Sequence, residues 1–206
     1  MQNSVLLYRH PLSGHSHRVQ LFASLAGINH TLVDVDLVNA EHKQDAFLAL
    51  NPLGQVPVIK DGDFVLADSN AILLYLARRY APDYLADNAL EEAQIQRYLS
   101  IAANEIANGP AAARLITVFG APFDAEATIA KANAILSVLN DELEGKTWLV
   151  GNKLTIADIA IYSYLAHAPE GNVSLEPYPN VRAHLASIES LPGFVAMQAT
   201  AAGLAA

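Results

Sequence analysis

The chain has 206 residues, a net charge of −9, a hydrophobic fraction of 52% and no cysteine. This length suits one large domain or two small ones, each able to bury a core. The absence of cysteine excludes disulfides, thiolate catalysis by the protein and cysteine-bound metals. Without a signal-like N-terminus or a run of about 18 apolar residues, we expect a cytoplasmic protein with no membrane span.

Charge is distributed unevenly along the chain. Residues 1–80 hold six Lys and Arg against seven Asp and Glu, whereas residues 81–206 hold six against fourteen. The step predicts a domain boundary near Tyr80. An anionic ligand would find its site more easily in the near-neutral first part. No basic stripe offsets the acidic surface, so we predict no nucleic-acid partner.

The first part of the chain alternates between strand-like and helix-like segments. We predict a short strand over residues 5–7, a loop over 10–15, a helix over 16–26 with Ser16 as its N-cap, and a second strand over 31–36. Because a crossover helix joins the two strands, they should pair in parallel.

A hairpin and a helix complete the first part. Residues 55–59 are typical of a strand that a proline enters, and Asp61-Gly62 predicts the turn to a return strand over 64–66. The resulting mixed sheet resembles a thioredoxin-like domain. Asp68 and Ser69 then open a helix that is apolar almost all round and should be largely buried.

The start of this last helix has two interpretations. Amide hydrogens of two strands and of a helix N-terminus converge there, which favours a bound anion. A cis peptide before Pro57 would turn the backbone groups of Val56 sideways toward such a ligand. The plainer interpretation is a β-hairpin followed by a well-capped helix, and local physics does not separate the two.

The second part is predicted to be helical throughout. We expect a linker over residues 81–89, where Pro82 stops the preceding helix, and an all-helical domain over 90–206. A long helix over 91–119 should bend at Gly109-Pro110, because Pro110 has no amide hydrogen for the carbonyl of Ile106.

Capping signals place the remaining helices. Asp124 opens a helix to about residue 144, and Thr155 with Asp158 forms a capping box. The capping box precedes an almost wholly apolar helix over 156–165, which we expect at the core of the second domain. The last two helices are predicted over residues 179–190 and 192–202.

Several motifs together resemble the glutathione transferases. Gln55-Val56-Pro57 followed by Asp68-Ser69-x-Ala71-Ile72 is similar to the glutathione-binding signature of that family. The family usually has Glu where this chain has Asp68. The similarity continues in Glu41-His42-Lys43, Phe47, Asn51-Pro52-x-Gly54 and Gly151-x-x-Leu154-Thr155-x-Ala157-Asp158. It is closest to the phi class and related serine-type and bacterial-type members.

The resemblance implies a fold, a reaction and partners. The fold would be a thioredoxin-like domain over residues 1–80 that binds glutathione, followed by the all-helical domain that contributes the pocket for an electrophile. The reaction would be a detoxification in which glutathione, as co-substrate, adds its thiolate to an electrophilic small molecule. The resemblance also implies a homodimer. Alternatives are a glutathione-dependent peroxidase or dehalogenase, or a non-catalytic ligand-binding or protein-interaction member of the same fold.

Such a reaction needs a hydroxyl that stabilises the thiolate. A thiol with a pKa of about 8.5 is only a few per cent ionised near pH 7, and the thiolate is the nucleophile. Three hydroxyls lie near the loop after the first strand. Ser13 matches the catalytic serine of phi-like members, and it is the predicted catalytic residue. Tyr8, which could equally be a core aromatic, and Ser16, which could be only a cap, are the alternatives.

The resemblance also assigns the contacts to glutathione. His42 and Lys43 would hold the glycine carboxylate, although they could equally be a solvated face. Gln55, Val56 and Pro57 would pair with the cysteinyl backbone by extending the sheet. Asp68 would bind the γ-glutamyl amine and Ser69 the adjacent carboxylate, although both could be ordinary helix caps. Asp is one methylene shorter than Glu, which leaves the reach of Asp68 open.

The electrophile pocket is expected in a cleft with an apolar lining. Arg114 could orient a polar or anionic electrophile, although most of the candidate residues could equally be helix packing. The histidines have no metal-ligand spacing, so we predict no metal site. His15 could touch the carboxylate-rich end of the ligand, but it fits an exposed loop better. The candidate lining residues are Leu12, Ile106, Pro110, Ala111, Arg114, Leu115 and Phe119.

Overall fold

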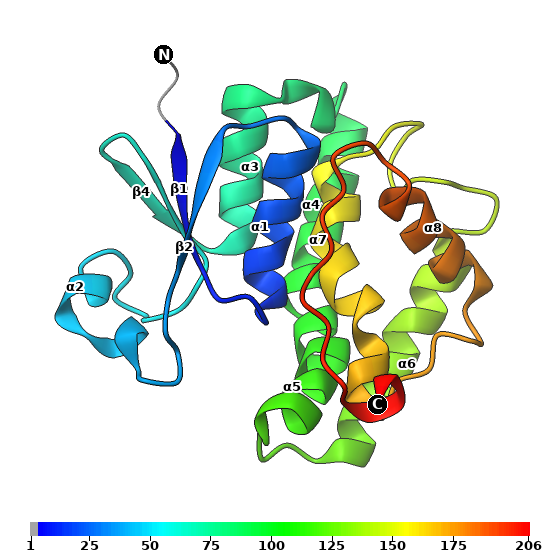
Figure 1. The fold of residues 1–206 in the computed structure, drawn as a ribbon. Coiled ribbons are helices and arrows are strands. Elements are labelled where there is room, and N and C mark those ends of the chain that lie inside the picture. Colours follow the sequence, from blue (N-terminus) through cyan, green and yellow to red (C-terminus); the bar gives the residue numbers. More distant parts are fainter. Residues whose placement is uncertain (1–3) are drawn as a thin grey trace. The chain divides into compact units, whose positions relative to one another are not determined.

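The computed structural model of the protein describes residues 4–206, which form two compact units (Figure 1). Unit 1 contains the described residues up to Pro82 together with Pro192–Gln198. Unit 2 contains Asp83–Leu191 and Ala199–Ala206. The predicted fold class is confirmed, because a mixed sheet with helices in the first part precedes a helical second part.

Within the described residues, unit 1 has one four-stranded sheet with the strand order β2-β1-β3-β4. Strand β1 pairs in parallel with β2, placing Leu7 opposite Leu32, and antiparallel with β3, placing Leu7 opposite Ile59. The parallel pair and the antiparallel hairpin therefore follow the prediction. The strands are β1 (Val5–Arg9), β2 (His30–Asp34), β3 (Val58–Asp61) and β4 (Phe64–Ala67).

Strand β3 begins three residues later than predicted. Pro57 has no amide hydrogen to give to a ladder, and the strand starts at Val58, directly after it. The peptide between Val56 and Pro57 is cis. The turn is also shifted by one residue, because Asp61 stays in the ladder opposite Phe64 and Gly62 has the positive φ of 62°.

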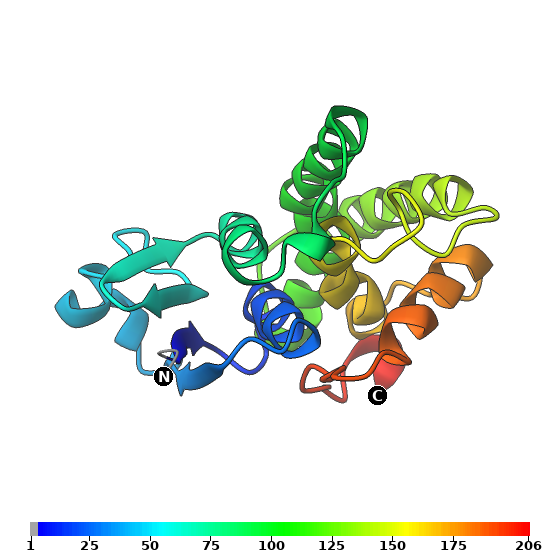
Figure 2. The ribbon, with the colours of Figure 1, turned by 90° about the horizontal axis from the view of Figure 1, so that it is seen from above.

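Helices cover both faces of the sheet. Figures 1 and 2 show α1 (Gly14–Leu25) and α3 (Ser69–Tyr80) side by side on one face, while α2 (Asp45–Leu48) lies on the other. The α2 side contains a cluster of Val35, Phe47 and Val58, all buried. Helix α3 buries one face through Ile72, Leu73 and Leu76, but Leu74 is 40% exposed. The helix was expected to be largely buried, and the structure buries one face of it and leaves the other partly exposed.

Unit 2 consists of helices and connecting loops. The predicted long helix is interrupted, and a π-helical turn, η3 (Ala107–Ala111), contains Gly109 and Pro110. A Cβ at Gly109 would lie 3.0 Å from the Cα of Ala132, so glycine lets η3 contact the backbone of α6. The longer helices are α4 (Ala89–Ala103), α5 (Ala112–Phe119), α6 (Ala125–Glu142), α7 (Ile156–Ala166) and α8 (Pro179–Glu189), with short 3-10 turns η2 (Pro82–Tyr84), η4 (Ala168–Gly171) and η5 (Gly203–Ala205). Among the described residues, no helix has the length and apolar character needed to cross a membrane.

Helix α7 is the core of unit 2, as predicted. Every residue from Ile156 to Leu165 is buried. The capping box is present, and the carboxylate of Asp158 accepts hydrogen bonds from Leu149 N at 2.8 Å, Thr155 N at 2.8 Å and Thr155 Oγ1 at 3.0 Å. One buried side chain thus fixes both the start of the helix and the loop before it.

The predicted helix over residues 192–202 was wrong, because this segment is extended. The carbonyl of Gly193 accepts from Ser24 Oγ at 2.6 Å, and the carbonyl of Val195 lies 2.8 Å from His17 Nε2. Both partners come from α1. Side chains of unit 1 therefore satisfy carbonyls that a helix would have satisfied internally, and Gly193 has a φ of 88° that few other residues adopt.

We expect Asp158→Ala to lower the free energy of unfolding by about 3 kcal/mol, because it leaves the buried amide hydrogens of Leu149 and Thr155 without an acceptor. The matched control is Asp124→Ala, which removes the exposed N-cap of α6 and should cost only about 1 kcal/mol. Urea unfolding of the three proteins measures both values. Equal losses of unfolding free energy in the two variants would show that the buried hydrogen bonds of Asp158 contribute no more than an exposed N-cap.

Candidate functional site

Ser13 is the N-cap of α1. Its Oγ accepts from Ser16 N at 3.2 Å, and its own backbone N–H donates to the carbonyl of His10 at 2.9 Å. The side chain is half-buried at the end of the loop that follows β1. Because the cap uses only a lone pair of the oxygen, the hydroxyl hydrogen can still be donated outward.

The other two candidate hydroxyls lie in different environments. Ser16 was expected to be the N-cap, but it lies inside the first turn of α1, fully buried, and its Oγ accepts from His10 N at 3.4 Å. Tyr8 lies on β1 and packs against the Val35, Phe47 and Val58 cluster, with its ring edge-on to Phe47 at 6.4 Å. The contacts of Tyr8 are those of a core aromatic.

Asp68 begins α3 with an unusual backbone. Its Oδ1 accepts from Ala71 N at 2.8 Å, as a capping residue should, and the side chain is exposed. Its φ is 73° and its ψ is 119°, a backbone conformation that residues other than glycine rarely adopt. Strain of this kind costs about 1–3 kcal/mol and is found preferentially at ligand clamps. The carboxylate is held at the surface beside the helix N-terminus.

A cluster of polar side chains lies directly behind Asp68. Arg18 Nη1 donates to Ser69 Oγ at 2.8 Å and to Asn70 Oδ1 at 2.9 Å, and His15 Nδ1 lies 3.3 Å from Ser69 Oγ. Arg18 is 1% exposed and Ser69 is 5% exposed. Burial, followed by the charge of Arg18, lowers the pKa of His15 to about 4, while Asp68 acts in the opposite direction. His15 is therefore neutral at pH 7.

The position of His15 corrects an expectation. It lies in the first turn of α1, half-buried, and not in an exposed loop.

Among the described residues, no group of three or more His, Cys, Asp or Glu side chains is arranged to hold a metal.

His42 and Lys43 lie in a 3-10 turn, η1 (Glu41–Lys43). Lys43 Nζ donates to the carbonyls of Leu53 at 3.3 Å and Gly54 at 3.1 Å. A Cβ at Gly54 would lie 2.9 Å from Lys43 Nζ, so only glycine at this position leaves room for the ammonium group. The Nδ1 atom of His42 is buried and has no hydrogen-bond partner within residues 4–206.

The segment before β3 leaves backbone groups open. In the described part of the chain, neither the N–H nor the C=O of Val56 is hydrogen-bonded to another backbone group. Asn51, which is 5% exposed, holds the segment by donating from Nδ2 to the carbonyl of Gln55 at 2.8 Å. Gln55 is exposed, Val56 half-buried and Pro57 buried.

The candidates for the electrophile pocket are divided between the units. Leu12 is half-buried in the loop of unit 1. In unit 2, Ile106, Pro110 and Ala111 are buried, and the helix-packing alternative describes them well. Leu115 and Phe119 are 37% and 48% exposed.

Arg114 lies inside unit 2 and is 2% exposed. Its Nε donates to Glu170 Oε2 at 2.7 Å, while Glu170 Oε1 lies 2.7 Å from His167 Nδ1. Thr200 adds donors from its backbone N–H at 3.0 Å and its Oγ1 at 2.8 Å. Burial raises the pKa of Glu170, but hydrogen bonds from His167, Thr200 and Arg114 outweigh it and lower the pKa to about 2. These contacts are those of a structural ion pair.

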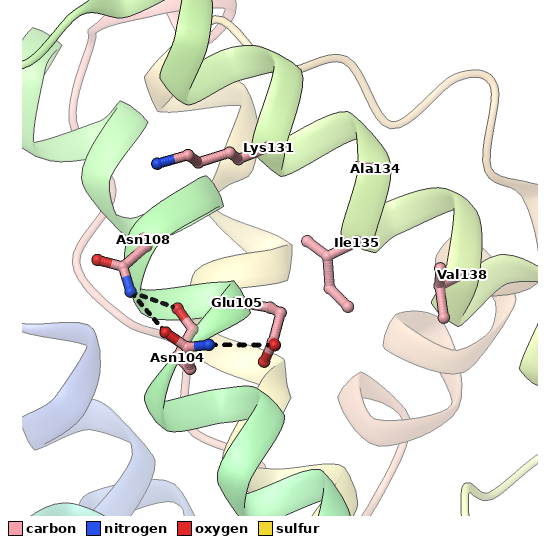
Figure 3. Close-up of a pocket in the computed structure, with 7 residues that line it drawn as sticks. All are labelled: Asn104, Glu105, Asn108, Lys131, Ala134, Ile135 and Val138. Atoms are coloured by element: carbon pink, nitrogen blue, oxygen red, sulfur yellow. Dashed lines mark hydrogen bonds between the residues drawn. The ribbon is translucent and has the colours of Figure 1, made fainter.

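Unit 2 also contains a cavity of about 450 Å³ beside the π-helical turn (Figure 3). Its lining combines apolar side chains from α6 with polar side chains from the segment that follows α4 and from η3. Asn108 Nδ2 donates to the carbonyl and to Oδ1 of Asn104, and Asn104 Nδ2 donates to Glu105 Oε1. None of the predicted electrophile-pocket residues lines this cavity, which is lined by Asn104, Glu105, Asn108, Lys131, Ala134, Ile135 and Val138.

Sequence reasoning missed three buried polar residues of these sites. Arg18 was not among the predicted site residues, although a charged residue that precedes the apolar Val19 and Leu21 within a predicted helix was a signal. Asn51 was noted only as part of a motif. Glu170 had no distinguishing local pattern apart from His167 three residues earlier, because Arg114 and Thr200 come from distant parts of unit 2.

Comparisons with known proteins point to one family. The family model described as the glutathione S-transferase N-terminal domain matches residues 3–78, and that of the C-terminal domain matches residues 118–192. Glutathione S-transferase theta-1 of Homo sapiens is 36% identical over 172 residues, covering 78% of this chain and 72% of the relative.

Two solved structures extend the comparison. A glutathione S-transferase from Pseudomonas fluorescens has a TM-score of 0.90 at 28% identity and covers 96% of this chain and 100% of its own. A glutathione transferase homologue from Drosophila mojavensis, solved with bound glutathione, has a TM-score of 0.84 at 25% identity and covers 92% and 89%.

We expect the Glu170 network to make stability depend on pH. Because the pKa of Glu170 in the folded state lies below its ordinary value of 4.5, its contribution is complete above about pH 5 and is lost as the pH falls through 2. Glu170→Gln should therefore lower the free energy of unfolding by about 3 kcal/mol at pH 7, and the difference should shrink toward pH 2. Urea unfolding at several pH values measures it. Glu144→Gln, at an exposed position, is the control, and a pH-independent difference would remove the carboxylate from the explanation.

Proposed function

Because the chain belongs to the glutathione S-transferase family, we propose that it adds the thiolate of glutathione to an electrophilic carbon of a small molecule, with Ser13 stabilising the thiolate. The observation that carries this proposal is the Ser13 cap, in which the oxygen serves the helix and the hydrogen stays available. The homodimer, the cytoplasmic location and the serine-type, phi-like assignment are parts of the same proposal.

The energy required is within reach of this arrangement. Lowering a thiol pKa by about two units takes roughly 2.7 kcal/mol of preferential thiolate stabilisation. A hydrogen bond to a charged group contributes about 1.5–3 kcal/mol, and a helix N-terminus adds about 0.3–1 kcal/mol. Ser13 offers both at once, because it is the hydroxyl donor and lies at the start of the 12-residue α1.

The environments of the three hydroxyls favour Ser13. Ser16 is fully buried within the loop and first turn, so a ligand sulfur has no access to it. Tyr8 is held by core contacts around Phe47. Ser13 is half-buried at the helix start, so it is more accessible than Ser16 to a group such as a ligand sulfur.

The remaining groups suit a peptide with two carboxylates and one amine. Val56 offers a backbone N–H and C=O for the cysteinyl residue, next to Gln55 and Pro57. Asp68 uses Oδ1 as a cap and retains acceptor capacity for the amine, while Ser69 lies beside it for the adjacent carboxylate. His42 and Lys43 would receive the glycine carboxylate, because the ammonium has a third donor and His42 Nδ1 has no partner in the described chain. The glutathione bound in the Drosophila mojavensis homologue supports the same ligand.

We expect Ser13→Ala to raise the pKa of bound glutathione thiol and to slow turnover at least tenfold near pH 7, because the thiolate loses its donor. The pH–rate profile with a generic aromatic electrophile and ultraviolet titration of the bound thiolate measure both effects.

Two matched variants separate catalysis from helix capping. Ser13→Gly keeps most of the cap stability but has no hydroxyl, so it should be as inactive as Ser13→Ala. Ser13→Thr keeps both the cap and the hydroxyl, and should retain activity. An unchanged pH–rate profile in Ser13→Gly would remove Ser13 from the mechanism. Retention of the wild-type protein on immobilised glutathione without turnover would instead favour a ligand carrier.

A further inference from the structure

Arg18 places a positive charge beneath the start of α3. Its guanidinium is 1% exposed, and one nitrogen, Nη1, donates to both Ser69 Oγ and Asn70 Oδ1. These two oxygens belong to the first two residues of α3, directly after the strained cap Asp68. A long side chain from α1 thereby fixes the first turn of another helix.

This contact sets the direction in which Ser69 can donate. A serine hydroxyl has one hydrogen and two lone pairs. Arg18 donates to the oxygen, so the hydroxyl hydrogen must be directed elsewhere, toward His15 Nδ1 at 3.3 Å or toward an acceptor outside the helix. A donor that is already engaged as an acceptor from a cation is polarised, and its hydrogen bond to an anion is strengthened.

The charge of Arg18 is effective at the neighbouring side chain. After burial, it is the main reason that His15 resists protonation. A field that disfavours a second cation at this point favours an anion there by the same physics. The dipole of α3 has the same sign at its N-terminus, so the two effects add.

We propose that Arg18 is a positioning residue that acts through Ser69 and Asn70 to bind the α-carboxylate of the γ-glutamyl group. This inference rests on the proposed glutathione binding and deepens it. Arg18 does not touch the ligand. It fixes the Ser69 oxygen as an acceptor, which leaves the hydroxyl hydrogen to be donated, and it supplies the counter-charge behind it. Its contribution therefore depends on whether the ligand has that carboxylate.

A pair of ligands separates this role from a purely structural one. Glutathione is compared with γ-aminobutyryl-cysteinyl-glycine, which has the same thiol, amine and glycine carboxylate but lacks the α-carboxylate of the γ-glutamyl group. Desaminoglutathione lacks only the amine and keeps the α-carboxylate, so it controls for the contribution of the amine. Isothermal calorimetry gives the three affinities for the wild type and for Arg18→Gln.

Arg18→Gln should weaken glutathione and desaminoglutathione at least tenfold and the γ-aminobutyryl analogue less than twofold. In steady-state kinetics the KM for glutathione should rise, while kcat changes less than threefold because the sulfur end is untouched. An equal loss of affinity for all three ligands would overturn the proposal and show that Arg18 has only a structural role.

A second variant keeps the test decisive if Arg18→Gln does not fold. Asn70→Ala retains the buried cation and removes one of its two anchors, so it should weaken both carboxylate-bearing ligands about threefold and leave the γ-aminobutyryl analogue unchanged. An equal effect on all three would again overturn the proposal. A wild type that binds none of the ligands at millimolar concentration would defeat the proposed function itself, whereas a wild type that binds all three equally would defeat only the carboxylate contact.

Discussion

The hydrogen bonds from Arg18 to the start of α3 are the constraint on which the site in unit 1 depends. The two proposed ends of the glutathione site lie at the beginnings of two helices, Ser13 at α1 and Asp68-Ser69 at α3. Sheet pairing fixes the strands but leaves the helix starts free to shift against each other. Burying a guanidinium is costly unless it is hydrogen-bonded, and Nη1 of Arg18 bonds to both Ser69 and Asn70, so displacing either residue would leave the buried charge less well satisfied.

Local signals in the sequence were sufficient for much of the fold. Asp124 and the Thr155–Asp158 capping box placed helix starts correctly, because a cap and the amides it accepts from lie within one turn. The crossover and the hairpin gave the mixed sheet for the same reason, since loop length and turn chemistry are local. The cap of α1 was predicted at Ser16 but lies at Ser13. The choice was made by packing that buries Ser16.

The remaining features depend on contacts between residues far apart in the chain. Pro192–Gln198 is extended because His17 and Ser24 bind its carbonyls, and no propensity within the segment predicts this. Likewise, the partners of Arg18 lie more than 50 positions away, as does the partner of Arg114. Family resemblance indicated candidate contacts for glutathione, but it gave no sign that Arg114 is committed to Glu170.

The two helix caps show how binding and stability coexist in this unit. At Ser13 they do not compete, because the cap uses a lone pair and the proposed chemistry uses the hydrogen. At Asp68 they do compete, because a φ of 73° costs free energy that a glycine would save. Glycine has no carboxylate for an amine, so relief of the strain would remove the proposed contact. The first turn of α3, held by Arg18, supports the strained conformation of Asp68. The cost of the proposed ligand clamp is therefore offset by a buried side chain, Arg18, that does not itself touch the ligand.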